Sequence, residues 1–371
     1  MSERIVVGIT QGDVNGIGYE VILKTFEDPT MFEFCTPVVY GSPKVMTYHR
    51  KAIDSPTNFN VVDSARDAQP DRLNVVNCNQ EDVKVDFGIP TEESGQAAFQ
   101  ALERAVKEYR EGLIDVLVTA PINKKNIQSQ DFQFTGHTEY LEAMVGEGGK
   151  SLMILMNDML RVALVTTHLP IESVTKAVTK EAIKEKAMVF YQTLRRDLRI
   201  SKPRIAVLAL NPHAGDNGLL GKEETEQIVP AIEELSNEGM TVFSPYAADG
   251  FFGTAAYTSF DGVLAMYHDQ GLAPFKALAS TTGVNFTAGL PLVRTSPDHG
   301  TAYDIAGKGI ADETSLRNAI YLAIDVFRNR IQYDEPMANP LKKHYHERHE
   351  DGDRPRFGAK QQEENLPQGE E

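Results

Sequence analysis

The sequence has few cysteines, no long apolar run and a shortage of basic residues. Only Cys35 and Cys78 occur among its 371 residues, too few for a disulfide framework, so we expect two reduced thiols in a cytoplasmic protein. No run approaches the roughly 20 apolar residues that span a bilayer. The first residues, MSERIVVGIT, lack a signal-peptide pattern. These absences predict a protein without a membrane partner.

Positive charge is the scarcer sign, because 37 Lys and Arg residues stand against 53 Asp and Glu residues and give a net charge of −16. This balance excludes a broad nucleic-acid-binding surface. It also disfavours non-specific attraction of an anionic substrate. We therefore expect a site for such a substrate to be positive locally.

The sequence contains short aliphatic runs that alternate with amphipathic ones. The aliphatic runs predict strands at residues 4–10, 36–41, 73–77, 115–121, 151–157, 160–168, 204–211, 241–246 and 262–268. Apolar residues that recur every three to four positions predict helices at about residues 94–111, 138–146, 181–198, 222–238 and 313–331. This alternation predicts an α/β fold with mainly parallel sheets. The length suffices for two domains.

The composition changes after Pro340, where aliphatic residues nearly vanish and charges of both signs mix. Such a segment buries too little apolar area to offset the entropy cost of ordering. We expect residues 1–340 to fold and residues 341–371 to form a charged flexible tail.

Three histidines follow apolar runs: His168 ends LRVALVTTH, His213 ends RIAVLALNPH and His268 ends GVLAMYH. Ligands of open α/β sheets bind outside the carboxyl ends of the strands, and three imidazoles there leave a metal ion open positions for substrate. Each histidine taken alone is more simply a polar edge residue. The repeated context predicts a mononuclear metal site, and residue types alone leave both interpretations open.

Two loops carry polar or glycine-rich motifs at predicted strand ends. In GITQGDVNGIGYE, Gly12, Gly16 and Gly18 suit either a tight structural turn or a backbone that approaches a ligand. In TAPINKKNI, Asn123 and Lys124 follow a strand and are expected to point into the crevice.

Further polar residues follow. His137 and Thr138 in FTGHTEYL begin a predicted helix, where they suit either a cap or an anion at the helix N-terminus. Polar, Gly and Pro residues gather around Lys276, Asn285 and Arg294, which is typical of a site built on loops. Lys276 and Arg294 have largely apolar neighbours, which favours a defined anionic partner for each.

Together these motifs resemble those of the 4-hydroxythreonine-4-phosphate dehydrogenase family of pyridoxal phosphate (vitamin B6) biosynthesis. HGTAYDIAGKG also resembles the coenzyme loop of isocitrate and isopropylmalate dehydrogenases. The resemblance implies their two-lobed α/β/α fold, with lobes that are discontinuous in sequence and an active site in the cleft between them. The matching blocks, in order, are GDVNGIG, TAPINK, FTGHTEYL, TTHLP, NPHAGDNGLLGKEE, YHDQGLAPFK and GLPLVRTSPDHGTAYDIAGKG.

The resemblance implies a homodimer that uses NAD and a divalent metal ion. The reaction would be oxidation of 4-phosphooxy-L-threonine with decarboxylation to 3-amino-2-oxopropyl phosphate. His168, His213 and His268 would bind the metal, one of them from the partner subunit, so that the active site is shared. Zinc, magnesium, manganese and cobalt are all candidates, and three imidazoles favour zinc or another transition metal over magnesium.

The resemblance also assigns residues to the substrate. His137, Thr138, Lys276, Asn285 and Arg294 would contact the phosphorylated hydroxy acid. Lys276 would in addition be the catalytic residue, stabilising charge on the oxygen during decarboxylation and handling the proton.

The coenzyme would be held in part by His299, Gly300 and Ala302. Residues 299–306 contain no Lys or Arg to meet a 2′-phosphate, so we expect NAD rather than NADP. Lys308 lies close by in sequence and weakens this preference.

Departures from the family pattern leave alternatives open. The family's GDPAGIGPE is GDVNGIGYE here, and residues 247–253, AADGFFG, replace a PADT segment and are expected to face the cleft or the coenzyme. The first alternative is a dehydrogenase of threonate or erythronate 4-phosphate. Others are a metal-dependent hydrolase or aldolase without NAD, and a non-catalytic metabolite-binding protein.

Overall fold

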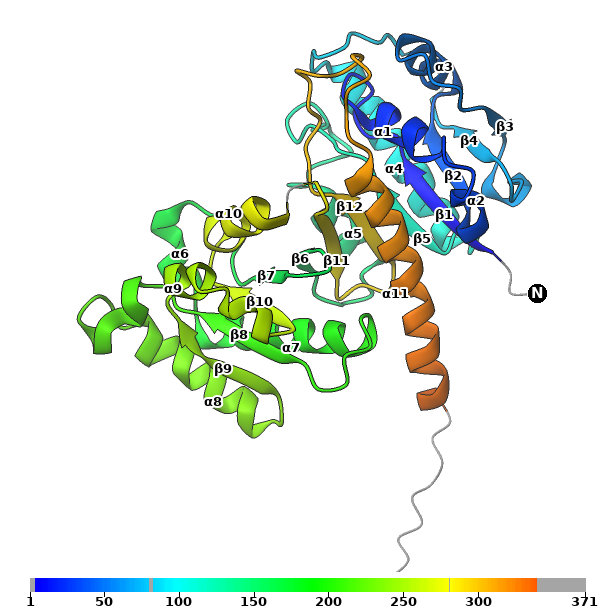
Figure 1. The fold of residues 1–371 in the computed structure, drawn as a ribbon. Helices are drawn as coiled ribbons and strands as arrows, with labels where there is room; N and C mark the ends of the chain where they lie inside the picture. Colours follow the sequence, from blue (N-terminus) through cyan, green and yellow to red (C-terminus); the bar gives the residue numbers. More distant parts are fainter. Residues whose placement is uncertain (1–3, 80–82, 280, 339–371) are drawn as a thin grey trace, which may run out of the picture.

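A single mixed sheet with helices packed against it forms the protein (Figure 1). The computed structural model describes residues 4–79, 83–279 and 281–338, so the predicted tail at residues 341–371 lies outside the described residues. The strands are β1 (Ile5–Thr10), β2 (Cys35–Gly41), β3 (Phe59–Val62), β4 (Leu73–Asn77), β5 (Val116–Thr119), β6 (Leu152–Met156), β7 (Arg161–Leu164), β8 (Arg204–Leu208), β9 (Thr241–Tyr246), β10 (Gly262–Ala265), β11 (Val284–Ala288) and β12 (Val293–Pro297).

The strand order is β3-β4-β2-β1-β5-β12-β11-β6-β7-β10-β8-β9. Neighbours run parallel except where β11 meets β12 and β6, and where β6 meets β7. The prediction of an α/β fold with mainly parallel strands is confirmed, and each predicted strand is present. The structure adds β3, β11 and β12, in which polar residues such as Asn60, Asn285 and Arg294 interrupt the aliphatic pattern.

The helices include all five that the sequence predicts. The one expected at residues 222–238 begins as a π-helical turn, Glu224–Ile228, before α8. Every helix of the described residues is too short or too polar to cross a membrane. The helices are α1 (Gly18–Thr25), α2 (Met31–Phe34), α3 (Pro43–Ala52), α4 (Glu92–Arg110), α5 (His137–Val145), α6 (Ile171–Ala177), α7 (Lys180–Arg196), α8 (Val229–Asn237), α9 (Ala248–Gly253), α10 (His268–Ala279) and α11 (Thr314–Ala338).

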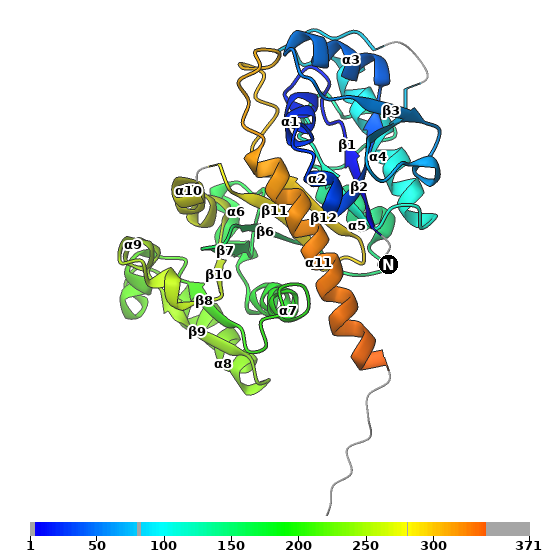
Figure 2. The same cartoon turned by 45° about the vertical axis from the view of Figure 1, so that its right-hand side comes forward.

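The two ends of the sheet belong to two lobes, seen from two directions in Figure 1 and Figure 2. One lobe contains β1 to β5 with α1, α3 and α4, and the other contains β7 to β10 with α7, α8 and α10. The strands β12, β11 and β6 lie between them in the sheet. The chain enters the second lobe through β6 and returns through β11 and β12.

The long helix α11 connects the lobes, because it contacts α1 in one and α7 in the other. Near its end Arg330 is 6% exposed and forms a two-pronged ion pair with Asp197, which is 2% exposed. Its Nε donates to Asp197 Oδ1 over 2.8 Å and a terminal nitrogen donates to Oδ2 over 3.0 Å. The other terminal nitrogen donates to the carbonyls of Leu290 and Pro291. Arg330 therefore joins α11 to the end of α7 and to the turn before β12.

We expect Arg330→Ala to lower the free energy of unfolding by about 3–5 kcal/mol, because it leaves the buried Asp197 carboxylate without its cationic partner. Arg196→Ala is the matched control, since Arg196 pairs with Asp334 between the same two helices but both side chains are substantially exposed. That variant should lose no more than about 1 kcal/mol. Urea unfolding of both variants measures the difference, and similar losses would contradict the assigned role of burial.

Candidate active site

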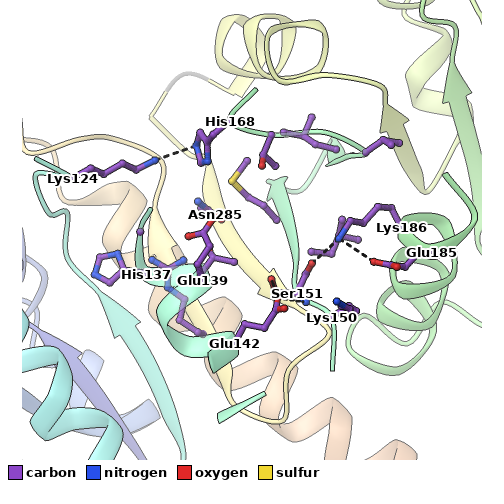
Figure 3. Close-up of a pocket in the computed structure, with 18 residues that line it drawn as sticks. Lys124, His137, Glu139, Glu142, Lys150, Ser151, His168, Glu185, Lys186 and Asn285 are labelled. Carbon is purple, nitrogen blue, oxygen red and sulfur yellow. Dashed lines mark hydrogen bonds and ion pairs between the residues drawn. The ribbon is translucent and has the colours of Figure 1, made fainter. Parts of the chain in front are cut away.

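A cavity of about 350 Å³ lies along the central strands of the sheet (Figure 3). Its walls come from the loop after β5, from α5, β6, the end of β7, α7, β11 and β12. Five residues that the sequence assigns to substrate or metal line it together: His137, Thr138, His168, Asn285 and Arg294. Residues more than 150 positions apart in the chain thus share one cavity.

The expectation of a site built on loops is wrong for two of these residues. Asn285 lies on β11 and Arg294 on β12, and the two strands pair antiparallel with Thr287 opposite Arg294. Side chains of opposed strand residues lie on the same face of a sheet. The polar residues that resemble a loop in sequence therefore form part of the rigid floor of the cavity.

Arg294 is a buried cation at the cavity wall, with 3% of its surface exposed. Its Nε donates to Thr119 Oγ1 over 3.1 Å and a terminal nitrogen donates to Thr287 Oγ1 over 3.0 Å. Burial lowers the pKa of Arg294 to about 10, and the nearby Glu139 carboxylate opposes this effect. The guanidinium remains protonated at neutral pH and is held by uncharged hydroxyls, an arrangement that favours a bound anion.

Two further cavity atoms are buried without a hydrogen-bond partner in the described part of the chain, His137 Nε2 and Asn285 Oδ1. Burial lowers the pKa of His137 well below its ordinary value, and the charges of Arg294 and Lys124 lower it further. The ring is therefore neutral at pH 7. Buried polar atoms are costly without partners, so both atoms are suited to hydrogen-bond a ligand in the cavity.

Lys124 lines the cavity. The sequence predicted that it points into the crevice but gave it no role. It follows β5 in the TAPINK motif, and its Nζ donates to His168 Nε2 over 3.1 Å (Figure 3). Burial and the Lys124 charge lower the pKa of His168. Lys150 and Lys186 line the opposite part of the cavity, where Lys186 contacts Glu185 and the Ser151 carbonyl. Lysines are too common on surfaces for sequence to have singled these two out.

The three strand-end histidines are only partly brought together. His168 and His268 have ring centroids 5.9 Å apart, and His268 Nδ1 lies 2.7 Å from Asp269 Oδ1. His213 is exposed, on a turn with left-handed backbone angles that follows β8. Among the described residues, no group of three His, Cys, Asp or Glu side chains is placed to hold a metal ion within one chain.

Lys276 lies outside the cavity, in a second pocket of about 350 Å³ that it shares with His299 and Ala302. Its Nζ is 3.1 Å from Asp298 Oδ1 and donates to the Asp298 carbonyl over 2.9 Å. His299 Nδ1 lies 3.0 Å from the Gly300 carbonyl oxygen, and Gly300 itself does not line the pocket. Ile17, Ile305 and Gly283 supply apolar surface to this pocket, and Thr281, Asp312 and Ser315 also line it. Lys276 thus belongs to the wall that carries the predicted coenzyme residues.

The glycines near the N-terminus form a structural turn. Gly12 has φ +71°, and a Cβ there would lie 2.4 Å from the Pro121 carbonyl oxygen. A Cβ on Gly16 would lie 2.7 Å from the Thr301 carbonyl oxygen. Only glycine allows these close approaches, so the loop fits against the segments that carry both pockets.

The segment at residues 247–253 does not line either of these two pockets. Its Phe251 is 3% exposed and packs against Tyr246 and Phe260, with ring centroids 5.2 Å and 5.7 Å away. The expectation that this segment faces the cleft is therefore wrong for Phe251, because the aromatic ring completes the hydrophobic core beside β9 and β10.

These features define an α/β protein with a polar cavity along its central strands, in which a buried arginine and unpartnered polar atoms suit a small anionic ligand. The family described as "Pyridoxal phosphate biosynthetic protein PdxA" matches residues 33–323, and the chain belongs to this family. It is accordingly a dehydrogenase, as the family members with assigned names are.

Individual relatives span nearly the whole chain. The "4-hydroxythreonine-4-phosphate dehydrogenase" of Bacteroides thetaiotaomicron is 63% identical over 351 residues, which cover 95% of this chain and 96% of the relative. The "D-threonate 4-phosphate dehydrogenase" of Cupriavidus necator is 41% identical over 318 residues, 85% of this chain and 95% of the relative. The crystal structure of 4-hydroxythreonine-4-phosphate dehydrogenase from Klebsiella pneumoniae is 32% identical, with a TM-score of 0.74 over 88% of this chain and 100% of that chain.

We expect Arg294→Ala to weaken binding of inorganic phosphate by roughly 10–100-fold, the effect of one or two lost charge-assisted hydrogen bonds. Arg294→Lys should restore only part of the affinity, because an ammonium lacks the two-pronged geometry. Lys186→Ala, which removes a cavity cation that already contacts Glu185, should have a smaller effect. Calorimetric titration measures all three, and equal affinities of wild type and Arg294→Ala would show that the anion binds elsewhere.

Proposed function

We propose that the protein oxidises 4-phosphooxy-L-threonine with NAD and decarboxylates the product to 3-amino-2-oxopropyl phosphate, a step of pyridoxal phosphate biosynthesis. The observation that carries the proposal is the cavity with a buried Arg294, beside the unpartnered polar atoms of His137 and Asn285. The 63% identity to a relative of that name supports the choice of substrate.

The substrate's anionic group is held in this proposal by Arg294, with His137 and Thr138 at the start of α5. Because both unpartnered atoms are acceptors when His137 carries its proton on Nδ1, they suit the hydroxyl and amino groups of the substrate. The strand positions of Asn285 and Arg294 orient the substrate rigidly, which favours a reactive geometry. Lys276 lies in the second pocket, so in this proposal it leaves Asp298 and reaches the substrate, where it stabilises the charge on the substrate oxygen during decarboxylation and then supplies the proton.

A divalent metal ion is the second part of the proposal. His168 and His268 are neighbouring imidazoles and suit zinc or another transition metal better than magnesium. His213 would come from the partner subunit of a homodimer, since it is exposed and apart from the pair within the chain. Such an ion supplies Lewis acidity that lowers the pKa of the substrate hydroxyl.

The coenzyme is the third part, with the nicotinamide ring as hydride acceptor. His299 and Ala302 line the second pocket, whose apolar surface suits a flat base. No Lys or Arg occurs in residues 299–306, so we propose NAD rather than NADP. A cytoplasmic location is part of the same proposal, because a soluble coenzyme pool must be accessible.

One alternative keeps specific support. The relative from Cupriavidus necator is named for D-threonate 4-phosphate and is 41% identical. That substrate has the phosphate, the carboxylate and the hydroxyl but not the amino group. A substrate panel separates the two, whereas a hydrolase or aldolase would act without NAD.

We expect turnover of 4-phosphooxy-L-threonine with NAD, followed by NADH absorbance, to exceed that of D-threonate 4-phosphate and erythronate 4-phosphate. A chelator should abolish the activity and added zinc, cobalt or manganese should restore it. NADP should support slower turnover than NAD. Preference for D-threonate 4-phosphate would replace the proposed substrate, and full activity after verified metal removal would contradict the metal.

The shared site predicts complementation between inactive chains. His213→Ala and His268→Ala should each lose nearly all turnover, and a mixture of refolded chains should recover part of it, because one site per mixed dimer keeps all three ligands. His168→Ala mixed with His268→Ala is the control, since these two rings are neighbours in one chain, and should recover none. Recovery in the control, or full activity of a verified monomer, would contradict the arrangement.

A further inference from the structure

A buried carboxylate, Asp13, lies where the loops of both pockets meet. The residue is 1% exposed, and four uncharged donors surround its side chain. Oδ1 accepts a hydrogen bond from the backbone nitrogen of Asn15 over 2.9 Å. Oδ2 accepts from Ser94 Oγ over 3.1 Å, from Asn126 Nδ2 over 2.8 Å and from the Tyr303 hydroxyl over 2.9 Å.

Each Oδ2 donor belongs to a different segment. Asn126 lies in the loop after β5, which also carries Lys124 and leads to His137 in the first cavity. Tyr303 lies in the loop after β12, close to Ala302 of the second pocket. Ser94 is in the first turn of α4. One carboxylate oxygen therefore fixes the substrate-side and the coenzyme-side loop relative to each other.

Backbone contacts around Asp13 reinforce this connection. The Asp13 nitrogen donates to the Pro121 carbonyl over 2.9 Å, and the Ile17 nitrogen donates to the Thr301 carbonyl over 3.1 Å. Ile17 itself lines the second pocket. Gly16 allows the close approach to Thr301 described above. The two loops are thus attached to one short segment whose centre is Asp13.

We propose that Asp13 is a positioning residue that sets the coenzyme loop through Tyr303 and the substrate loop through Asn126. The role rests on the proposed function only in naming the occupants of the two pockets. Carboxylate chemistry explains why an aspartate stands here, because three donors converge on one oxygen. An asparagine would direct either an amide nitrogen or a weaker acceptor at them.

Tyr303→Phe tests the connection between Asp13 and the coenzyme-side loop. It removes one hydroxyl and leaves the Asp13 contacts to Ser94 and Asn126 in place. In the metal-loaded enzyme we expect the KM and the Kd for NAD to rise about tenfold, the effect of a charge-assisted hydrogen bond. The kcat and the KM for the phosphorylated substrate should change by less than about twofold, within the scatter of distant substitutions.

Tyr40→Phe is the matched control. Tyr40 donates its hydroxyl to the buried Glu108 over 2.7 Å in the same lobe, and among the described residues its hydroxyl forms no hydrogen bond to Asp13 or to the loop that carries Tyr303. Both variants should lose similar thermal stability, whereas only Tyr303→Phe should weaken NAD binding. Equal effects of the two variants on the NAD constants, or unchanged constants in Tyr303→Phe, would overturn the positioning role.

Asp13→Asn extends the test to both loops, because Asp13 contacts each of them. It should raise the KM values of NAD and of the substrate together. Amide hydrogen exchange of the protein without NAD keeps the inference separate from the proposed coenzyme. Exchange in residues 298–310 should be faster in Tyr303→Phe than in wild type and Tyr40→Phe. If wild type bound no NAD, the proposed function would fail while this difference still supported the positioning role. Unchanged exchange in Tyr303→Phe would overturn the positioning role alone.

Discussion

The charge of Arg294 is the constraint on which the rest of the site depends. A guanidinium that is 3% exposed has lost most of its hydration, and the hydroxyls of Thr119 and Thr287 replace only part of it. Glu139 acts on it electrostatically but forms no hydrogen bond or ion pair with it among the described residues. An anionic ligand would complete the compensation, so a protein with a net charge of −16 can still select an anion at this one place.

The sheet is what allows such a cation to be held. β12 runs parallel to β5 and antiparallel to β11, so the arginine and its two threonines come from three adjacent strands. The helix α11 packs across β12 and contacts both lobes, so it covers the face of these strands opposite the cavity. The positions of the cavity and of the second pocket beside Lys276 then follow from where the loops leave the strand ends. The Asp13 network links those loops, so substrate and coenzyme positions are set by the same framework.

The sequence predicted the aliphatic part of this framework and missed the polar part. β1, β2, β4 to β8 and β10 have largely aliphatic sequences, which report burial on both faces, whereas the edge strand β9 is more polar and partly exposed. β11 and β12 carry Asn285, Thr287 and Arg294 toward a cavity. These polar residues interrupt the aliphatic pattern by which a buried strand is recognised in a sequence. Their pairing with β5 and β6 involves residues more than 100 positions away, which no local pattern encodes.

Residue chemistry alone predicted only part of the candidate site. An arginine among apolar residues favoured an anionic partner, the histidines at strand ends suited either a metal ion or a polar edge, and the family resemblance gave these residues roles. The ion pair of Lys276 with Asp298 and the contact of Lys124 with His168 depend on side-chain placement in the fold. The role of Asp13 could not be predicted for the same reason. Its partners Ser94, Asn126 and Tyr303 are separated from one another by 32 or more positions in the sequence.

The most direct measurement is a crystal structure of the enzyme with 4-phosphooxy-L-threonine and a divalent metal bound. We predict that Arg294 keeps its contacts to Thr119 and Thr287 and donates to an anionic oxygen of the substrate, with Asn285 and His137 at hydrogen-bond distance from the same molecule. A substrate bound with both anionic groups away from Arg294, and the guanidinium still held by hydroxyls alone, would contradict it.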